Sequence, residues 1–207
     1  MSNYVFFPTN NIGKYERYKK SFEKRNVHYE RYYNDIKVNV IEDEDSLLEN
    51  AKKKAKAYYE EYKKYVKEKF LIMSTDEALY IDGLDDDEQP GIFVRRFNGL
   101  DRASDDEVVA RYTSFIRKMG GEAKAKWVYS LIVFDGKDFF DYSWDEDVLF
   151  SDTPHLPITK GYVLNNITIV KKVNGKNIML SDLTEEEQYN YLAKYIDKVC
   201  EFVISKF

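Results

Sequence analysis

The apolar residues of this chain recur with spacings that change along its length and predict both helices and strands. Tyr4–Phe7 is a short apolar run typical of a strand, and residues 11–26 carry apolar side chains at the spacing of a helix. Residues 46–70 keep the helical spacing over a longer stretch. Ser46 followed by Glu49 has the form of a capping box, which predicts that this helix begins at Ser46.

Strand patterns dominate the middle of the chain. Residues 36–40 alternate between apolar and polar side chains, as a half-buried strand does, and residues 70–73 form a compact apolar strand. Trp127–Phe134 is the strongest strand pattern in the chain. The Asp135-Gly136 pair that follows predicts a hairpin turn into a second strand over residues 139–144.

The remaining patterns complete a mixed fold. Residues 105–119 predict a helix that ends at Gly120-Gly121, residues 162–173 predict a further β region, and residues 184–207 predict an amphipathic helix. Helices and strands interleave early and a β-meander follows. We therefore expect an α/β fold with a mixed sheet, in a single domain that covers residues 1–207.

Composition narrows the class of protein. A share of 43% apolar and 33% charged residues is that of a globular chain. The net charge of −5, with lysines mixed among acids, argues against binding a nucleic acid polymer. No apolar stretch approaches the length of a membrane span. No signal peptide pattern opens the chain, and its single cysteine, Cys200, fits a reducing compartment, so we expect a cytoplasmic protein.

The segment between the first strand and the first helix could bind an anion. It consists of Thr9, Asn10, Asn11, Ile12, Gly13 and Lys14. Backbone N–H groups at a helix start favour phosphate, and Thr9 and Lys14 could add a hydroxyl and a positive charge. The glycine pattern of a P-loop is missing, and strand-turn-helix junctions are common in proteins that bind no phosphate.

Two acidic features are candidates for metal or proton chemistry. The run Glu42–Asp45 precedes a predicted helix, where acids either suit the helix dipole or help to bind Mg²⁺. Asp76 follows the apolar run Leu71–Met73, at what the pattern predicts to be a strand end facing a ligand crevice. The alternatives for Asp76 are a turn cap or an ion pair with Arg95 or Arg96.

Four segments, taken in order, resemble the inosine triphosphate pyrophosphatase family. The family carries the motifs T-x-N-x-x-K, E-T-G-x-T-F-x-E-N-A, A-D-D-S-G-L-x-V-D-A-L and P-G-x-x-S-A-R-Y-x-G. In this chain the similar segments are residues 9–14, 42–51, 74–84 and 90–99. The resemblance covers about residues 4 to 100, and the spacing within each segment is kept.

The resemblance implies an elongated α/β fold of two lobes with a central cleft, in a homodimer. It implies a Mg²⁺-dependent reaction in which water attacks a nucleoside triphosphate and gives a monophosphate and pyrophosphate. By position, Asp76 would be the general base and a metal ligand, and Glu42 a second metal ligand. The segment from Thr9 to Lys14 would hold the triphosphate with Glu77 and Arg96 beside it, and Tyr162 would stack on the base.

The chain also departs from the family. Thr75 replaces the first aspartate of the central motif, and Glu77 replaces its serine, which adds negative charge beside phosphate unless Glu77 binds the metal. Gly161–Val163 lacks the aspartate of the family's G-Y-D motif, and the histidine-arginine pair that selects the base is missing. Neither His28 nor His155 falls where that pair is expected. The base preference is therefore open.

Three hypotheses follow. The first is a Mg²⁺-dependent hydrolase that acts on a non-canonical or modified nucleoside triphosphate. The second is a catalytically inactive nucleotide-binding or scaffolding protein on the same fold, which the loss of the aspartate at Thr75 favours. The third is an interaction module whose 18 tyrosines and 13 phenylalanines serve packing and a dimer face. Dependence of turnover on Mg²⁺ and on Asp76 separates the first from the others.

Overall fold

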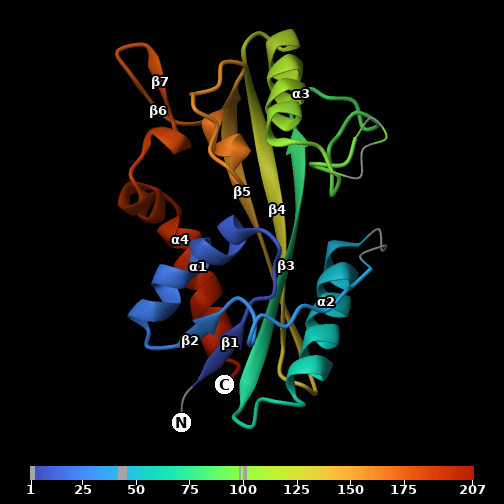
Figure 1. Ribbon diagram of the computed structural model, residues 1–207. Helices are drawn as coiled ribbons and strands as arrows, with labels where there is room; N and C mark the ends of the chain where they lie inside the picture. Colours follow the sequence, from blue (N-terminus) through green and yellow to red (C-terminus); the bar gives the residue numbers. More distant parts are fainter. Residues whose placement is uncertain (1–2, 42–45, 98, 100–101) are drawn as a thin grey trace. The chain divides into compact units, whose positions relative to one another are not determined.

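The computed structural model describes residues 3–41, 46–97, 99 and 102–207, and within them the chain forms one seven-stranded sheet with four α-helices (Figure 1). The strands are β1 (Tyr4–Phe6), β2 (His28–Glu30), β3 (Phe70–Ile81), β4 (Glu122–Phe134), β5 (Phe139–Ser151), β6 (Thr168–Val173) and β7 (Lys176–Met179). The helices are α1 (Ile12–Lys24), α2 (Leu47–Tyr62), α3 (Asp105–Lys118) and α4 (Glu185–Ile204), with two 3₁₀ turns, η1 (Val163–Asn166) and η2 (Leu180–Asp182).

The sheet is mixed, in the strand order β2-β1-β3-β4-β5-β6-β7. β1 pairs in parallel with both β2 and β3, whereas β6 pairs antiparallel with β5 and β7. The predicted α/β class with a mixed sheet is confirmed. Parallel neighbours require a crossover connection, and α1 and α2 supply the connections from β1 to β2 and from β2 to β3.

The chain forms two compact units, each assembled from separate segments. The first consists of residues 1–77, 129–144 and 192–207, and the second of residues 78–128 and 145–191. Whether both act as one functional domain stays a prediction.

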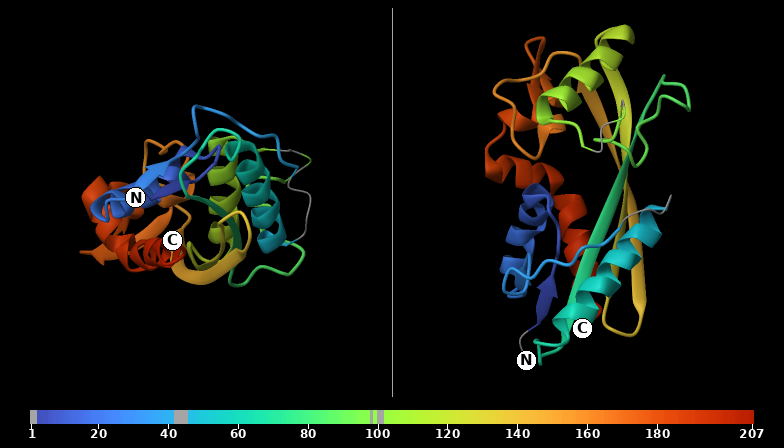
Figure 2. Two further views of the ribbon diagram at one scale, coloured as in Figure 1. Left: turned by 90° about the horizontal axis from the view of Figure 1, so that it is seen from below. Right: turned by 45° about the vertical axis from the view of Figure 1, so that its right-hand side comes forward.

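In the first unit, α1 and α2 cover opposite faces of the strands (Figure 2). Alternation along β1 explains this, because successive side chains of a strand point to opposite faces. Phe6 packs edge-on against Tyr62 of α2, with ring centroids 5.2 Å apart. The next residue, Phe7, packs against Tyr18 of α1 at 5.8 Å. Residues 4–7 therefore anchor both helices.

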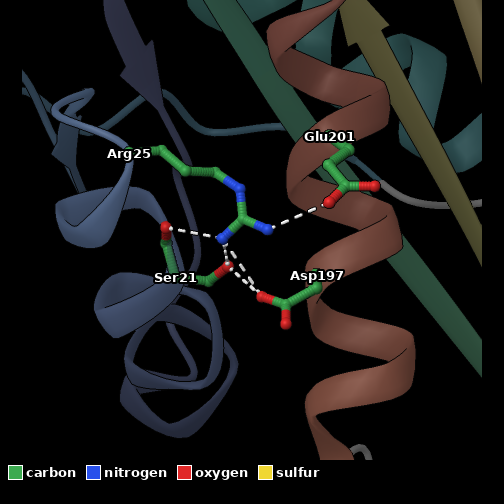
Figure 3. Close-up of polar contacts among 4 residues, drawn as sticks. All are labelled: Ser21, Arg25, Asp197 and Glu201. Carbon is green, nitrogen blue, oxygen red and sulfur yellow. Dashed lines mark hydrogen bonds and ion pairs between the residues drawn. The ribbon is translucent and has the colours of Figure 1, made fainter.

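A polar cluster joins α1 to the C-terminal part of α4 (Figure 3). The hydroxyl of Ser21, which is fully buried, donates to Asp197 at 2.7 Å. Arg25 donates to the same carboxylate at 3.1 Å and to Glu201 at 3.1 Å. Because Ser21 is out of reach of water, this network satisfies a hydroxyl that would otherwise destabilise the fold.

Replacing Asp197 with alanine is expected to lower the free energy of unfolding by about 1–2 kcal/mol, because a charged acceptor is removed from the buried Ser21. Glu201 is the matched control, since 67% of its side chain is exposed and its ion pair is screened by water. Urea unfolding should show a change below about 0.5 kcal/mol for Glu201→Ala. Equal losses in the two variants would contradict a special role for Asp197.

Cys200 lies on the same helix and is buried, as the apolar residues around it predict. Burial raises the pKa of its thiol to about 12. Since the thiolate is the nucleophile, the native protein should react with a disulfide reagent at pH 8 about 10³-fold more slowly than a free thiol. Absorbance of the released thiol before and after unfolding in urea measures this. A fast reaction of the native protein would show that Cys200 is accessible.

In the second unit, α3 packs on a core that includes Leu79, Ile81, Tyr112 and Phe150. Ser104 and Glu107 form a reciprocal capping box at the start of α3. At its end the Gly121 N–H donates to the Ile116 carbonyl at 3.0 Å and the Gly120 N–H to the Arg117 carbonyl at 3.2 Å. Both glycines have positive φ. The Gly-Gly stop is thus confirmed as a Schellman motif.

Several predicted boundaries are wrong. Residues 36–40 form no strand, although Ile36, Val38 and Val40 are half-buried against the core that contains α2. The alternation of apolar and polar side chains over residues 36–40 therefore results from contact of the apolar ones with a core, and not from strand pairing. The long helix ends at Tyr62, because residues 63–65 turn before β3. β3 itself runs to Ile81, so Asp76 lies within a strand and not at its end.

The other β regions also differ from the prediction. β4 and β5 are each 13 residues long, more than the sequence pattern indicates. The predicted β region over residues 162–173 begins with the 3₁₀ turn η1, and β6 starts only at Thr168. The pattern does not predict β7, which forms a hairpin with β6 through a turn at Asn174-Gly175, where both residues have positive φ.

Candidate functional site

The turn that follows β1 is a capped helix start. Asn11 is the N-cap of α1, and its side-chain oxygen accepts from the Gly13 N–H at 3.0 Å. The Asn11 N–H in turn donates to the hydroxyl oxygen of Thr9 at 3.1 Å. These bonds fix the backbone of residues 9–13, and Asn10 and Ile12 are exposed beside it. Such a preorganised helix start is suited to an anion.

Lys14 joins this turn to β3. Its ammonium lies 3.3 Å from the carboxylate of Glu77. The Glu77 N–H donates to the carboxylate of Asp76 at 3.0 Å. Lys14 thus contacts Glu77, the residue next to Asp76, and joins two of the segments that carry the family resemblance.

The register of β3 explains how the turn reaches Asp76. The last pair between β1 and β3 is Phe6 with Ile72, so β3 continues beyond the end of β1. Ile72 packs in the core with α2, and side chains two residues apart share a face. Asp76 therefore lies on the face of α2, whereas Glu77 lies on the opposite face, where it meets Lys14 of α1.

The residues before Asp76 are buried and uncharged. Thr75, at the position of the family's first aspartate, is 6% exposed. Ser74 is fully buried, and its hydroxyl has no hydrogen-bond partner within the described part of the chain. A buried hydroxyl is normally hydrogen-bonded, so this position has a donor available to a water molecule or a ligand.

A pocket of about 280 Å³ opens beside the turn, on the side of β2. It is lined by Tyr15, Glu30, Arg31, Tyr32, Asp35 and Lys37. Arg31 Nε donates to the Thr9 carbonyl at 2.6 Å, and the Tyr32 hydroxyl donates to the Asn10 side chain at 3.1 Å. Burial raises the pKa of Tyr32, which keeps this hydroxyl protonated. Sequence reasoning missed the pocket because residues 30–37 carry no motif.

The remaining predicted site residues lie in the second unit or outside the described residues. Arg96 and Tyr162 belong to the second unit, and their part in the site stays a prediction. The Arg96 guanidinium lies 4.8 Å from the centroid of the Phe93 ring. Tyr162 is partly buried at the start of η1. Glu42 lies outside the described residues, so its predicted role as a metal ligand is likewise untested.

Residues 3–41, 46–97, 99 and 102–207 contain no group of three or more histidine, cysteine, aspartate or glutamate side chains arranged to hold a metal ion. Within the same ranges, every helix is too short or too polar to cross a membrane.

A family model described as the Ham1 family matches residues 5–149, which is more than half of the chain. The chain belongs to the Ham1 family. The curated dITP/XTP pyrophosphatase of Aquifex aeolicus (strain VF5) is 29% identical to it over 135 residues. That match spans 62% of this chain and 62% of the relative, which is less than two thirds of the relative's length.

Solved structures of Ham1 proteins share the fold. A HAM1 protein from Coxiella burnetii superposes with a TM-score of 0.71 at 14% identity, covering 99% of this chain and 100% of that one. The Ham1 protein of Staphylococcus aureus gives 0.62 at 19% identity, again over 99% and 100% of the chains. The resemblance seen in the sequence and the α/β fold expected from it are both confirmed.

Proposed function

We propose that this Ham1 protein is a Mg²⁺-dependent hydrolase that splits a non-canonical nucleoside triphosphate into its monophosphate and pyrophosphate. The observation that supports the proposal is the contact of Lys14 with Glu77, because it links a phosphate-type turn to the residue next to Asp76 on β3. The dITP/XTP pyrophosphatase named among its relatives supports a deaminated purine as the base. We also propose, from the family resemblance alone, a cytoplasmic homodimer.

In this proposal the candidate site residues of the first unit bind phosphate, accept a proton or hold the metal. The N–H groups of the turn, the Thr9 hydroxyl and Lys14 hold phosphate oxygens. Asp76 accepts the proton of the attacking water as the bond between the α- and β-phosphates breaks. Carboxylate oxygens suit Mg²⁺, which needs only one or two of them in addition to phosphate oxygens, so Asp76 and Glu42 would hold it. When bound, Mg²⁺ neutralises phosphate charge and orients the water.

Glu77 competes with the substrate for Lys14. Since the pair is partly exposed and Glu77 faces away from Asp76, we expect Glu77→Gln to lower KM about threefold to fivefold, with kcat changed less than about twofold. Initial rates over a range of substrate concentrations test this. A large loss of kcat would instead assign Glu77 to the metal.

Release of pyrophosphate from a panel of triphosphates tests the proposed function. The panel contains the triphosphates of inosine, xanthosine, their deoxy forms and the common nucleosides, each with Mg²⁺ and with excess chelator. We expect release from a deaminated purine nucleotide that stops when the chelator is added. The buried, uncharged Thr75 favours the alternative of an inactive nucleotide-binding protein, which predicts binding of triphosphate without release. The molar mass measured by light scattering in solution tests whether the protein is the proposed dimer.

A further inference from the structure

We propose that the pocket beside β2 binds the pyrophosphate part of the substrate, and that Arg31 and Lys37 are the residues that hold it. This inference rests on the proposed function and adds to it a leaving-group site. The pocket, of about 280 Å³, is lined by both cations and two tyrosines. That volume can hold a pyrophosphate, and the charged side chains that line the pocket suit phosphate groups.

The strand order places this pocket on the side of the turn away from Asp76. β1 lies between β2 and β3, and the turn leaves the end of β1. Asp76 is on β3, and Glu30 and Arg31 are at the end of β2. Since neighbouring strands are about 4.8 Å apart, β2 and β3 are separated by roughly 10 Å. An extended triphosphate whose α–β bond is held near Asp76 would therefore direct its terminal phosphates toward β2.

The two cations are fixed in place and available. The Arg31 guanidinium is 5.0 Å from the centroid of the Tyr32 ring, and the Lys37 ammonium is 5.5 Å from it. Arg31 uses Nε for the Thr9 carbonyl and its side chain also interacts with Tyr32, and the guanidinium has further N–H donors for a phosphate. No described carboxylate forms an ion pair with Arg31 or Lys37. Arg31 thus links the turn to the pocket.

Glu30 and Asp35 line the same pocket, so its four charged side chains sum to zero. These carboxylates would repel a phosphate without a bound cation. When a divalent cation is bound to the phosphate, the cation attracts the carboxylates and the phosphate oxygens attract Arg31 and Lys37. The pocket should therefore prefer magnesium pyrophosphate to free pyrophosphate. It should also give little affinity for a nucleoside monophosphate, which lacks the groups that reach it.

Titration calorimetry with pyrophosphate, in the presence and absence of Mg²⁺, tests the proposal without requiring turnover. We expect binding that strengthens with Mg²⁺ and weakens about tenfold in both Arg31→Gln and Lys37→Gln. Loss of binding in Arg31→Gln could come from a change in the turn, because Arg31 donates to the Thr9 carbonyl. Lys37→Gln leaves that bond intact, so loss of binding in this variant reports the pocket itself. The control is Lys56→Gln, an exposed lysine on α2 outside the pocket, which should bind like the unchanged protein.

The outcomes separate this inference from the proposed function. Pyrophosphate binding that is absent, or equal in Lys37→Gln and Lys56→Gln, would overturn the leaving-group site even if triphosphates are hydrolysed. Binding that depends on Arg31 and Lys37 supports the site even if the assay panel shows no turnover. Binding that weakens on addition of Mg²⁺ would overturn the role given to Glu30 and Asp35.

Discussion

Asp76→Asn is expected to lower kcat by about 10³-fold. A positioned general base contributes roughly 10² to 10⁴ to the rate, and the same change removes a carboxylate offered to Mg²⁺. Asparagine keeps the shape of the side chain and can still accept the Glu77 N–H bond through its amide oxygen. The fold should therefore survive, with a thermal midpoint close to that of the unchanged protein.

Single-turnover release of pyrophosphate measures this effect, because it excludes slow product release. Asp86→Asn is the matched control, since Asp86 is exposed in the turn region after β3 and should keep full activity. The Asp76→Asn variant should still bind nucleotide, because the turn and Lys14 are unchanged. Activity retained in Asp76→Asn, with the control also active, would remove Asp76 from the role of base.

Tyr112→Ala is expected to lower the free energy of unfolding by about 3–5 kcal/mol, the loss typical of a large aromatic side chain removed from a core. Tyr112 is fully buried on α3, in the core of the second unit. Burial also raises the pKa of its hydroxyl, which donates to the Val94 carbonyl at 2.9 Å. This bond ties α3 to the segment that follows Gly91.

Comparison with Tyr112→Phe separates packing from hydrogen bonding. Phenylalanine keeps the ring and loses only the bond to Val94, so its expected cost is about 1 kcal/mol. Guanidinium unfolding followed by tyrosine and tryptophan fluorescence gives both values. A loss in Tyr112→Phe as large as in Tyr112→Ala would mean that the Val94 bond, and not the ring, holds this part of the unit.

The sequence predicts the elements of the fold better than their ends. α1, α3 and α4 are where the helical spacing indicates, because each has an apolar face and a side-chain cap at its start. The predicted β3 is too short, since its later residues Thr75 to Glu77 are polar while the strand ladder continues through them. Strand pairing hydrogen-bonds the backbone N–H and C=O groups whatever side chains the residues carry. The pattern of apolar and polar side chains therefore does not show where the pairing ends.

The candidate site is predictable only where a motif exists. Thr9, Asn11, Lys14 and Asp76 are predicted from ordered motifs, and the structure adds the contact of Lys14 with Glu77. Arg31 and Lys37 cannot be found in this way. Their proximity to the turn depends on the path of residues 31–37 past β1, which is set by bonds such as that from Arg31 to the Thr9 carbonyl. Long-range contacts of this kind leave no local pattern.

The division of each unit among separate segments limits how this protein can change in evolution. The first unit draws on three stretches of the chain and the second on two. No single continuous piece of the gene encodes either unit, so recombination at one point cannot exchange one of them for that of another protein. Insertions are tolerated most readily at tight exposed turns, and the tip between β6 and β7 at Asn174-Gly175 is such a point. New domains are therefore expected to be added at this turn of the second unit before they are added within the helices or strands of either unit.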